Sequence, residues 1–358
     1  NVTGIKSDVA AITGLLKRHN ALAFWDYAAA APYVGIDMNG ENPIDAVFIS
    51  PHKFIGGPGT PGLLVVKESI LTNSVPTTVG GGTVAYVTPQ DHRYIDDKEQ
   101  REEGGTPAIV ESVRAGLVFK LQQEVGTDEI ERLEGDFITR AIARFTTCEN
   151  LEIMGNPDAH RLSIVSLRFK HKNKDLHYGF VVSLLNDLFG IQVRGGCSCA
   201  GPYGHSLLGM DMTYSKAIES EIAQGASILR PGWVRLNFNY FIDEEEFEYI
   251  LKAIELVAQY GWRLLPFYHF DAIAGVWRYQ NQHSILVTSL QSLCLTDYCT
   301  TPPAPNNSKV SLIGQCERAE QELRRENLSG ATSVLELSDE SERLRWFVLP
   351  QELTAQLE

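Results

Sequence analysis

The sequence predicts an α/β protein: a partial large domain with a mixed sheet, followed by a smaller α+β domain. Two observations carry this prediction. In the first part of the chain, short continuous apolar runs alternate with amphipathic stretches, as buried strands alternate with surface helices in such folds. From about residue 150 the strand-like segments instead alternate apolar and polar residues, which is typical of half-buried strands. At 358 residues, the chain is long enough for two ordinary domains.

The elements of the first part follow in a regular order. "SDVAAITGLLKRHN" predicts a helix, because Ser7 and Asp8 are capping residue types in front of apolar residues at helical spacing. "ALAFWDYAAAAP", "DAVFIS" and "GLLVV" predict three strands, and the short join near Lys53 leaves some of their pairing antiparallel. "GGTPAIVESVRAGLVFKLQQEV" and "DEIERLEGDFITRAIARFTT" predict two amphipathic helices, separated at Gly126-Thr127.

The second part predicts a smaller unit and a tail. "RLSIVSLRFK" and "WVRLNFNYF" read as strands, each followed by a helix, in "DLHYGFVVSLLNDLFG" and "DEEEFEYILKAIELVAQYG". We therefore expect the remainder of a large domain over 1–125, a small α+β domain over 126–265 and a tail over 266–358. The tail contains a Pro-rich linker near 301–308 and one helix around "CERAEQELRRENL".

Composition narrows the classes of partner. The formal net charge of -14 argues against nucleic acid and against an anionic membrane surface as main partners. No apolar run approaches the length of a membrane span. The six cysteines are too few for a disulfide framework and none forms a Cys-x-x-Cys pair, so we expect no metal site and a reducing, cytoplasmic location.

Two charged residues follow neighbouring strands. Asp26 stands at the end of "ALAFW" and Lys53 lies just past "DAVFIS", and ligand-binding residues gather at the carboxyl ends of strands in α/β sheets. A buried carboxylate needs a partner, and the protonated pyridine of pyridoxal phosphate, whose aldehyde condenses with lysine, is one that fits. Ser50 and His52 could then donate to the phosphate. From the residues alone, pairing of Asp26 with a buried arginine and a solvated Lys53 remain equally open.

Longer stretches resemble a known family. "FWDYAAAAPYVGIDMN" followed by "DAVFISPHKFIGGPGTPGLLVV" resembles the class V aminotransferases, the fold-type I pyridoxal-phosphate enzymes that include the cysteine desulfurases. The shared pattern is a strand ending in Asp, then Ser-x-His-Lys and a Gly-Pro-x-Gly turn. "GGGTV", "REEGGTP", "VRGGCSCAGP" and "WVRLNFNY" match further motifs in the correct order. The resemblance extends from Asn1 to about Trp262 and implies a fold-type I architecture.

The resemblance implies roles around the cofactor. Lys53 would form the Schiff base with pyridoxal phosphate and later move the Cα proton of an amino-acid substrate. Asp26 would keep the pyridine nitrogen protonated, Ser50 and His52 would bind the phosphate, and Asn1 would lie near the cofactor hydroxyl.

It also implies contacts with a second subunit and with the substrate. Thr106 would reach the phosphate of the neighbouring subunit, which implies a homodimer with shared sites. Arg235 would grip the substrate α-carboxylate through its two-pronged guanidinium. The structural alternatives are a helix cap before Pro107 for Thr106 and a strand-surface ion pair for Arg235.

One cysteine bears on the reaction. The desulfurase pattern Arg-x-Gly-x-x-Cys-Ala-x-Pro is met by Arg194, Gly196, Cys199, Ala200 and Pro202. In desulfurases this cysteine takes the substrate sulfur as a persulfide and leaves alanine, and a cation such as Arg194 would favour its thiolate. Cys197 would be a second thiol or a filler, and a sulfur-acceptor protein is a possible partner. The alternatives are an aminotransferase without thiol chemistry, a non-catalytic relative, and a small buried Cys199.

Three departures from the family pattern stand out. The glutamine that contacts the cofactor hydroxyl is Ala29 here, and the residue after Asp26 is the bulky Tyr27. The upstream half of the cofactor domain, with its phosphate-binding turn and stacking aromatic ring, has no counterpart. We therefore expect the sequence to be a fragment that is inactive by itself.

Overall fold

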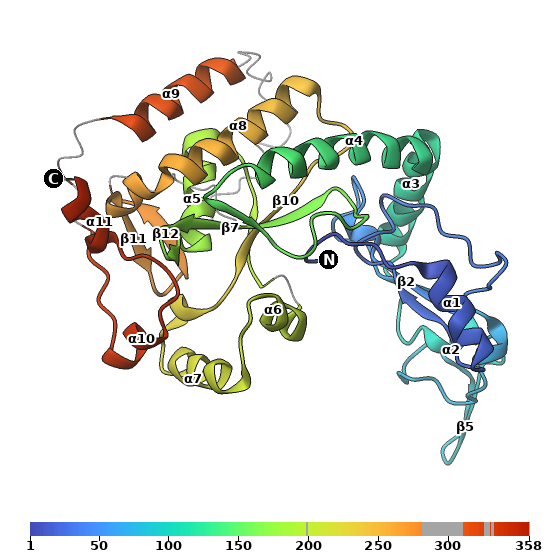
Figure 1. Cartoon of the computed structure of the whole chain (residues 1–358). Helices are drawn as coiled ribbons and strands as arrows, with labels where there is room; N and C mark the ends of the chain where they lie inside the picture. The colour runs from blue at the N-terminus through green and yellow to red at the C-terminus, as the bar shows by residue number, and fades with distance from the viewer. Residues whose placement is uncertain (198–199, 281–310, 326–329, 331–332, 358) are drawn as a thin grey trace, which may run out of the picture. The chain divides into compact units, whose positions relative to one another are not determined.

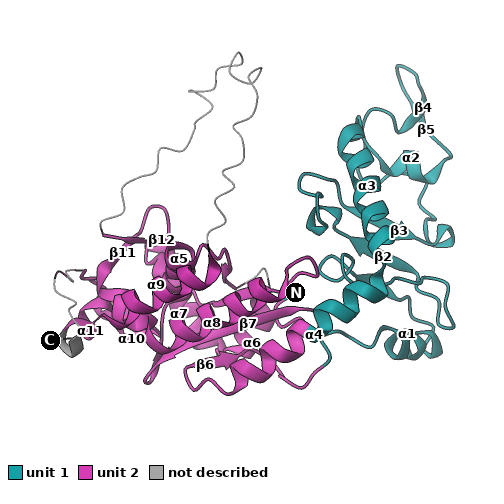
Figure 2. Cartoon of the chain, turned by 90° about the horizontal axis from the view of Figure 1, so that it is seen from above, with its two compact units in different colours: residues 1, 5–136, 160–162 teal, residues 2–4, 137–159, 163–358 magenta. Residues whose placement is uncertain are grey.

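The computed structural model describes residues 1–197, 200–280, 311–325, 330 and 333–357, which form two compact units (Figure 2). Unit 1 contains residues 1, 5–136 and 160–162, and unit 2 contains residues 2–4, 137–159 and the described residues from 163 onward. Both units combine helices with strands, which confirms the predicted α/β class. Among the described helices, none is both long and apolar enough to cross a membrane.

Unit 1 is built on a three-stranded sheet in the order β1–β2–β3, whose central strand β2 is labelled in Figure 1. The strands are β1 (Phe24–Asp26), β2 (Ala46–Ile49) and β3 (Leu63–Val66), one in each predicted apolar run. β2 pairs parallel with β1 and antiparallel with β3, so the mixed pairing predicted from the short join is confirmed. Because β1 and β2 are parallel, their carboxyl ends lie at the same edge of the sheet.

A buried carboxylate fixes helix α1 (Val9–Arg18) to this sheet. Asp45, directly before β2, accepts a hydrogen bond from the backbone N–H of Ala23 at 2.8 Å and also pairs with Lys17 of α1. Lys67, directly after β3, lies 3.5 Å from its other oxygen. Burial alone would raise the pKa of Asp45, but these donors outweigh it and leave the pKa below its usual value.

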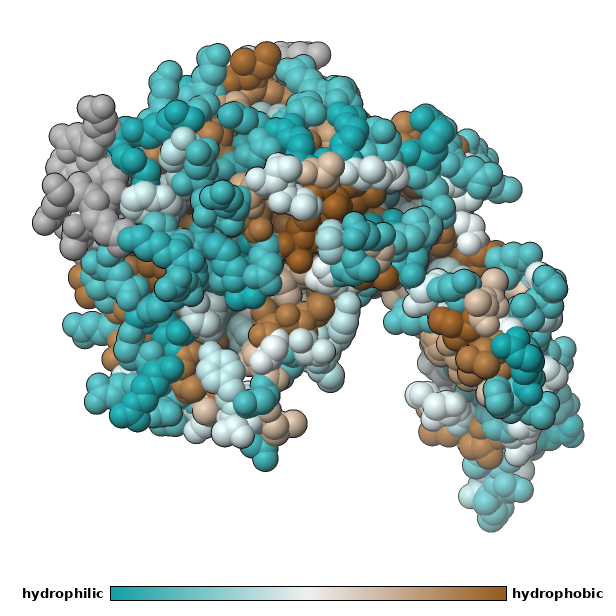
Figure 3. Space-filling view, in the orientation of Figure 1, coloured by the Kyte–Doolittle hydropathy of each residue, from teal (hydrophilic) through white to brown (hydrophobic). Residues whose placement is uncertain are grey.

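Burial is uneven on both faces of the sheet, because Val65 beside Val47 is 45% exposed and Ala46 beside Phe24 is 1% exposed. Val47 on one face is 1% exposed and belongs to a core that includes Phe54. On the other face Phe24, Phe48 and Leu64 are 50%, 44% and 54% exposed, and apolar side chains are also visible on the surface of unit 1 in Figure 3. The prediction of fully buried strands is therefore wrong, because several of their apolar side chains are half-exposed.

Two helices follow the sheet, and the expected break between them at Gly126 is confirmed. α3 (Ile109–Val125) and α4 (Thr127–Thr146) flank that glycine. α3 buries Ala115 and Val118 on one side. Its outward side carries an apolar stripe, the α3 stripe, whose members are between 40% and 68% exposed: Ile109, Val110, Val113, Leu117 and Leu121. The remaining elements of the unit are η2 (Glu68–Ile70), β4 (Val84–Val87), β5 (His92–Tyr94) and α2 (Lys98–Glu102).

The chain reverses sharply after β2. The short helix η1 (Pro51–Lys53) is followed by its capping residue Phe54, whose backbone N–H donates to the carbonyl oxygen of Pro51 at 3.0 Å. A Cβ atom at Gly57 would lie 2.0 Å from that same oxygen, so no larger residue fits there without a backbone shift. Gly56 has φ +76°, a conformation that favours glycine.

Unit 2 is built on a five-stranded antiparallel sheet. Its main path runs β6–β7–β10–β9, with β8 beside β7 (Figure 1). The strands are β6 (Leu151–Ile153), β7 (Ile164–His171), β8 (Lys174–Asp175), β9 (Arg194–Gly196) and β10 (Trp233–Asn237). The helices predicted after β7 and β10 are confirmed as α5 (Tyr178–Phe189) and α8 (Glu244–Tyr260).

The expectation that β7 and β10 are half-buried is wrong. The first four residues of β7 are all buried. Four of the five residues from Gly232 to Leu236 are buried as well. One side chain of β10 explains this, because Trp233 packs with Val2 and Met154 in a small cluster apart from the main core. Residues on both faces of the sheet are therefore covered.

The tail is part of the core of unit 2. The predicted helix is confirmed as α9 (Leu312–Arg324), whose Leu323 is fully buried. Phe347 and Leu353 are also 0% exposed and belong to the same core. The proline-rich segment near 301–308 lies outside the described residues. The sequence did not reveal five other elements of this region: η4 (Gly261–Phe267), β11 (Tyr268–Asp271), β12 (Val276–Tyr279), α10 (Asp339–Leu344) and α11 (Pro350–Leu357).

Replacement of Phe347 by alanine tests whether the tail belongs to the core. We expect the free energy of unfolding to fall by about 3–5 kcal/mol, the usual cost of removing a buried phenyl ring. Urea denaturation of the full chain measures this. Val334→Ala is the matched control, because Val334 lies in the same region and is 64% exposed. Equal stabilities of the two variants would contradict the packing described above.

Gly57 and Gly116 form a second matched pair. Gly57→Ala forces its Cβ against a backbone oxygen, so we expect the free energy of unfolding to fall by about 1–3 kcal/mol. Gly116 lies inside α3, with no atom within 4 Å of the position that a Cβ would take. Gly116→Ala should therefore raise the free energy of unfolding by about 0.5–1 kcal/mol. Opposite signs in urea denaturation are the expected result, and the same sign would contradict the geometry of the turn.

Candidate active site

Lys53 is presented by the turn after β2. It is the last residue of η1, its backbone N–H donates to the carbonyl oxygen of Ser50 at 3.0 Å, and its side chain is exposed. His52 is exposed beside it. Ser50 precedes the turn, and its hydroxyl does not cap η1. The three polar residues that the sequence singles out therefore lie together at the carboxyl end of β2.

Helix α3 holds this turn in place. The buried ring of Phe54 packs edge-on against Phe119 of α3, with ring centroids 4.9 Å apart. The guanidinium of Arg114, also on α3, donates to the carbonyl oxygens of Gly56 and Pro58 at 3.0 and 2.8 Å. Arg114 is thus a positioning residue for the Lys53 turn. Sequence reasoning missed it, because nothing in a lone arginine on a helix indicates which distant carbonyls it contacts.

Asp26 ends the neighbouring parallel strand. Its Cα is paired with Phe48 of β2, and its Oδ1 accepts a hydrogen bond from the backbone N–H of Ala28 at 2.7 Å. The expectation of a buried carboxylate is wrong, because Asp26 is exposed. It points to the same side of β1 as the half-exposed Phe24. The carboxylate is accessible, with one of its oxygens already oriented by the backbone.

A pocket of about 690 Å³ within unit 1 contains both Asn1 and Asp26. Ala29, which stands where the family pattern has a glutamine, and Tyr27 also line it. The described residues that line this pocket do not include Lys53, Ser50 or His52. The structure therefore brings together Asn1 and Asp26, two of the residues expected around the cofactor, in one pocket with Ala29.

This pocket also contains charged or titratable residues that were not predicted as site residues, among them Lys6, Glu131 and His160. Lys6 and Glu131 form an ion pair at 3.4 Å, and His160 joins them in the wall. The segment around His160 is held by backbone pairing, because Ile5 bridges to Arg161 and the N–H of Lys6 donates to the carbonyl oxygen of His160 at 2.9 Å. Lys6 is more than a hundred positions from both Glu131 and His160 in sequence, so only the fold reveals their proximity.

In unit 2 the two expected substrate-binding arginines are neighbours. Arg235 of β10 is directly opposite Arg194 of β9 in the antiparallel register. Side chains directly opposite each other in such a pair extend from the same face of the sheet. Ser166 of β7 flanks Arg235 on its other side, and its hydroxyl donates to the carbonyl oxygen of Val2 at 2.6 Å. The register thus places both arginines on one face of the sheet, and a guanidinium is a residue type suited to binding a carboxylate.

Thr106 and the cysteines of the desulfurase motif are the remaining predicted residues. Thr106 is exposed in the turn before α3, and the residue that caps α3 is Ala108, so the alternative of a helix cap for Thr106 is wrong. Cys199 lies outside the described residues, whereas Cys197 is described and exposed. Within the described part of the chain, no group of three or more His, Cys, Asp or Glu side chains is arranged to hold a metal ion.

Comparison with known proteins places these features in a family. The family model "Aminotransferase class-V" matches residues 1–249. The chain is 31% identical over 202 residues to a probable cysteine desulfurase of Halalkalibacterium halodurans, which covers 56% of this chain and 47% of the relative. It is 29% identical over 185 residues to a probable cysteine desulfurase of Staphylococcus aureus, and the match covers 52% of this chain and 43% of the relative. The chain thus spans about half the length of the curated relatives it matches.

Solved structures agree with this placement. The apo structure of a cysteine desulfurase from Thermococcus onnurineus NA1 matches with a TM-score of 0.58 at 25% identity, over 72% of this chain and 58% of that one. The cysteine desulfurase CsdA from Escherichia coli matches with a TM-score of 0.59 at 19% identity, over 72% of this chain and 57% of that one. The motifs, the fold and the family model agree, and the chain belongs to the class V aminotransferases, a family of fold-type I pyridoxal-phosphate-dependent enzymes.

Proposed function

We propose that this chain takes part in a pyridoxal-phosphate-dependent reaction that removes sulfur from cysteine. The observation that carries the proposal is the placement of Lys53 and Asp26 at the carboxyl ends of the parallel strands β2 and β1. An amine and a carboxylate at one sheet edge are what this cofactor requires of its protein. The curated relatives, named as probable cysteine desulfurases, support cysteine as the substrate.

The residues of unit 1 fit the cofactor chemically. The accessible carboxylate of Asp26 can accept a hydrogen bond from a pyridinium nitrogen, and the exposed amine of Lys53 can condense with an aldehyde. The Ser50 hydroxyl and the His52 ring can donate to a phosphate, and we assign to Thr106 the phosphate of the second subunit. When bound, pyridoxal phosphate supplies an electron sink for the bonds at the substrate Cα.

We further propose that residues 1–125 form the remainder of a cofactor-binding large domain and 126–265 a small domain. The half-exposed side chains of Phe24, Phe48 and Leu64, which share one face of the sheet, support this, because sheets of this class have helices on both faces. Further protein against that face would bury these side chains. It would also enclose Asp26, which lies on the same face.

Different side chains of this protein would bind the substrate, move its proton and contact the cofactor. Arg235, with Arg194 beside it, would bind the α-carboxylate through paired N–H donors, which fixes the direction of the Cα–H bond. Lys53 Nζ would take the proton from Cα and return it to the product. Asn1 lies in one pocket with Asp26 and would contact the cofactor hydroxyl. Ala29 replaces the glutamine that makes this contact in the family pattern, so Asn1 would make it without that second residue.

We assign the sulfur-accepting role to Cys199, on its motif position. Its thiolate would attack the sulfur of the bound cysteine, so that an S–S bond forms while the substrate C–S bond breaks. The electron pair of the broken bond stays with the substrate carbon, which is protonated to give alanine. A neighbouring cation such as Arg194 would favour the thiolate form. A sulfur-acceptor protein would then discharge the persulfide, and a cytoplasmic location would keep the thiol reduced.

Cysteine turnover by the full-length protein tests this function. We expect alanine and persulfide in equal amounts with the unaltered protein. Lys53→Ala should abolish both products, and Cys199→Ser should lower sulfur release by at least about 100-fold, because each removes a covalent step. Cys148→Ser is the matched control, since Cys148 is a half-buried cysteine that the proposal does not use. Undiminished cysteine turnover in Cys199→Ser would contradict a desulfurase, and amino transfer to a keto acid in that variant would identify an aminotransferase.

We also propose that the protein is a homodimer whose interface includes the α3 stripe. The stripe presents five exposed apolar residues over the length of one helix, which is more than a solvated helix surface normally carries. Leu117 lies within it and is 60% exposed. Thr106, assigned above to the second subunit, lies just before the same helix.

Leu117→Glu tests the dimer. We expect the dissociation constant to rise by at least about tenfold, because a buried carboxylate would have no partner in the interface. Sedimentation equilibrium of the full-length protein measures this. Lys120→Ala is the control, since Lys120 is exposed on the same helix outside the stripe and pairs with Glu124. A monomeric unaltered protein, or an unchanged dissociation constant in Leu117→Glu, would contradict the proposal.

A further inference from the structure

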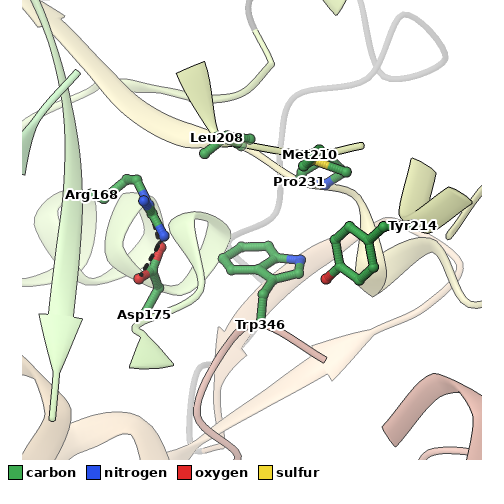
Figure 4. Close-up of a pocket in the computed structure, with 8 residues that line it drawn as sticks. Arg168, Asp175, Leu208, Met210, Tyr214, Pro231 and Trp346 are labelled. Atoms are coloured by element: carbon green, nitrogen blue, oxygen red, sulfur yellow. Dashed lines mark hydrogen bonds and ion pairs between the residues drawn. The ribbon is translucent and has the colours of Figure 1, made fainter. Parts of the chain in front are cut away.

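Unit 2 contains a second pocket, of about 140 Å³, that the proposed reaction does not use (Figure 4). Four segments that are distant in sequence build its wall. They are the β7–β8 region, the α6–α7 region, the approach to β10 and the tail. The lining residues are Arg168, Asp175, Leu208, Met210, Tyr214, Pro231, Gly232 and Trp346. In this region α6 spans Gly201–Leu207, α7 spans Met212–Ala223 and η3 spans Ser227–Leu229.

The polar groups of the two aromatic residues in this wall are already paired. The hydroxyl of Tyr214 donates to the carbonyl oxygen of Leu344 at 2.7 Å. The indole N–H of Trp346 donates to the carbonyl oxygen of Leu229 at 3.1 Å. With these hydrogen bonds made, both rings offer apolar surface to the pocket, next to Leu208. A ligand gains contact area here and little hydrogen bonding.

The charges at the other end of the pocket are balanced. Arg168 Nε donates to Asp175 at 2.7 Å, as Figure 4 shows, and its Nη1 donates to Glu152 at 3.0 Å. Lys170 lies 2.8 Å from Glu152 and 2.9 Å from Asp175. Two cations thus face two anions, so a charged ligand would lose its hydration without gaining a counter-charge. The pocket favours a neutral ligand.

Size and stacking limit the ligand further. A dry apolar cavity of about 150 Å³ accommodates one benzene ring, and this pocket is close to that volume. The Trp346 indole is itself braced, because it stacks on the buried ring of His177 at 5.3 Å and 24° and lies near-parallel to Tyr178 at 6.1 Å. A rigid indole is a favourable partner for a second aromatic ring.

We propose that this pocket binds a small neutral molecule with a single aromatic ring, and that the ligand strengthens the attachment of the tail. The tail already pairs with the β7–β8 region through its backbone. The N–H of Asp175 donates to the carbonyl oxygen of Trp346 at 3.2 Å, and the N–H of Val348 donates to that of Asp175 at 2.9 Å. A ring between Trp346 and Leu208 would add contacts between the tail and the α6–α7 region, so binding and tail attachment are coupled.

Ligand-observed fluorine NMR on the full chain tests the proposal with three probes. Fluorobenzene should show saturable broadening and should raise the melting temperature in a concentration-dependent way. 4-Fluorobenzoate carries a charge and 4-fluorobiphenyl has two rings, so both should bind at least about tenfold more weakly. The absence of saturable fluorobenzene binding, or equal binding of the benzoate, would overturn the proposal.

Two variants locate the binding. Leu208→Trp should fill the pocket and weaken fluorobenzene binding by at least about tenfold, because the added ring takes the same space. Ile273→Trp is the matched control: Ile273 is fully exposed in the β11–β12 turn, and its replacement should leave binding unchanged. Circular dichroism of Leu208→Trp checks its fold, and Met210→Phe replaces it if that fold is lost. Unchanged binding in the filled variant would place the ligand elsewhere and overturn the assignment.

Discussion

The parallel pairing of β1 with β2 is the constraint on which the rest of the candidate site depends. It sets the register in which Asp26 lies opposite Phe48, and so brings the end of β1 and the turn after β2 to one edge of the sheet. The turn can follow the strand so closely only because Gly57 has no Cβ to meet the Pro51 carbonyl. Arg114 and Phe119 of α3 then hold the turn from the other side. The exposure of Lys53 is a consequence of this tightly held backbone.

Local patterns predicted most of the elements but not their environment. The apolar runs that became β1, β2 and β3, and the break at Gly126, were readable because each depends on neighbouring residues alone. Burial was predicted less well, because Phe24 is half-exposed and β7 is covered on both faces, and these outcomes depend on chain far away in sequence. The pairing of Arg194 with Arg235 and the role of Arg114 likewise depend on register and tertiary contacts.

The tail shows the same limit most clearly. The family model ends at residue 249, yet the core of unit 2 continues through Phe347 and Leu353. The buried ring of His177 explains part of this attachment: its Nδ1 accepts hydrogen bonds from the N–H of Gly179 and from the indole N–H of Trp277. The proton therefore resides on Nε2, which donates to Ile228, and burial lowers the pKa of His177 to about 3. A neutral histidine at the start of α5 thus bonds to Trp277, which lies beyond the family match.

The central claim is that Lys53 is the residue that bonds to pyridoxal phosphate while Asp26 faces the ring. Borohydride reduction of the full-length protein loaded with the cofactor, followed by peptide mapping, tests it most directly. We expect a reduced pyridoxyl group on the peptide that contains Lys53, and a shifted absorbance of the bound cofactor in Asp26→Asn before reduction. A pyridoxyl group on another lysine, or no stable adduct with a correctly folded protein, would contradict it.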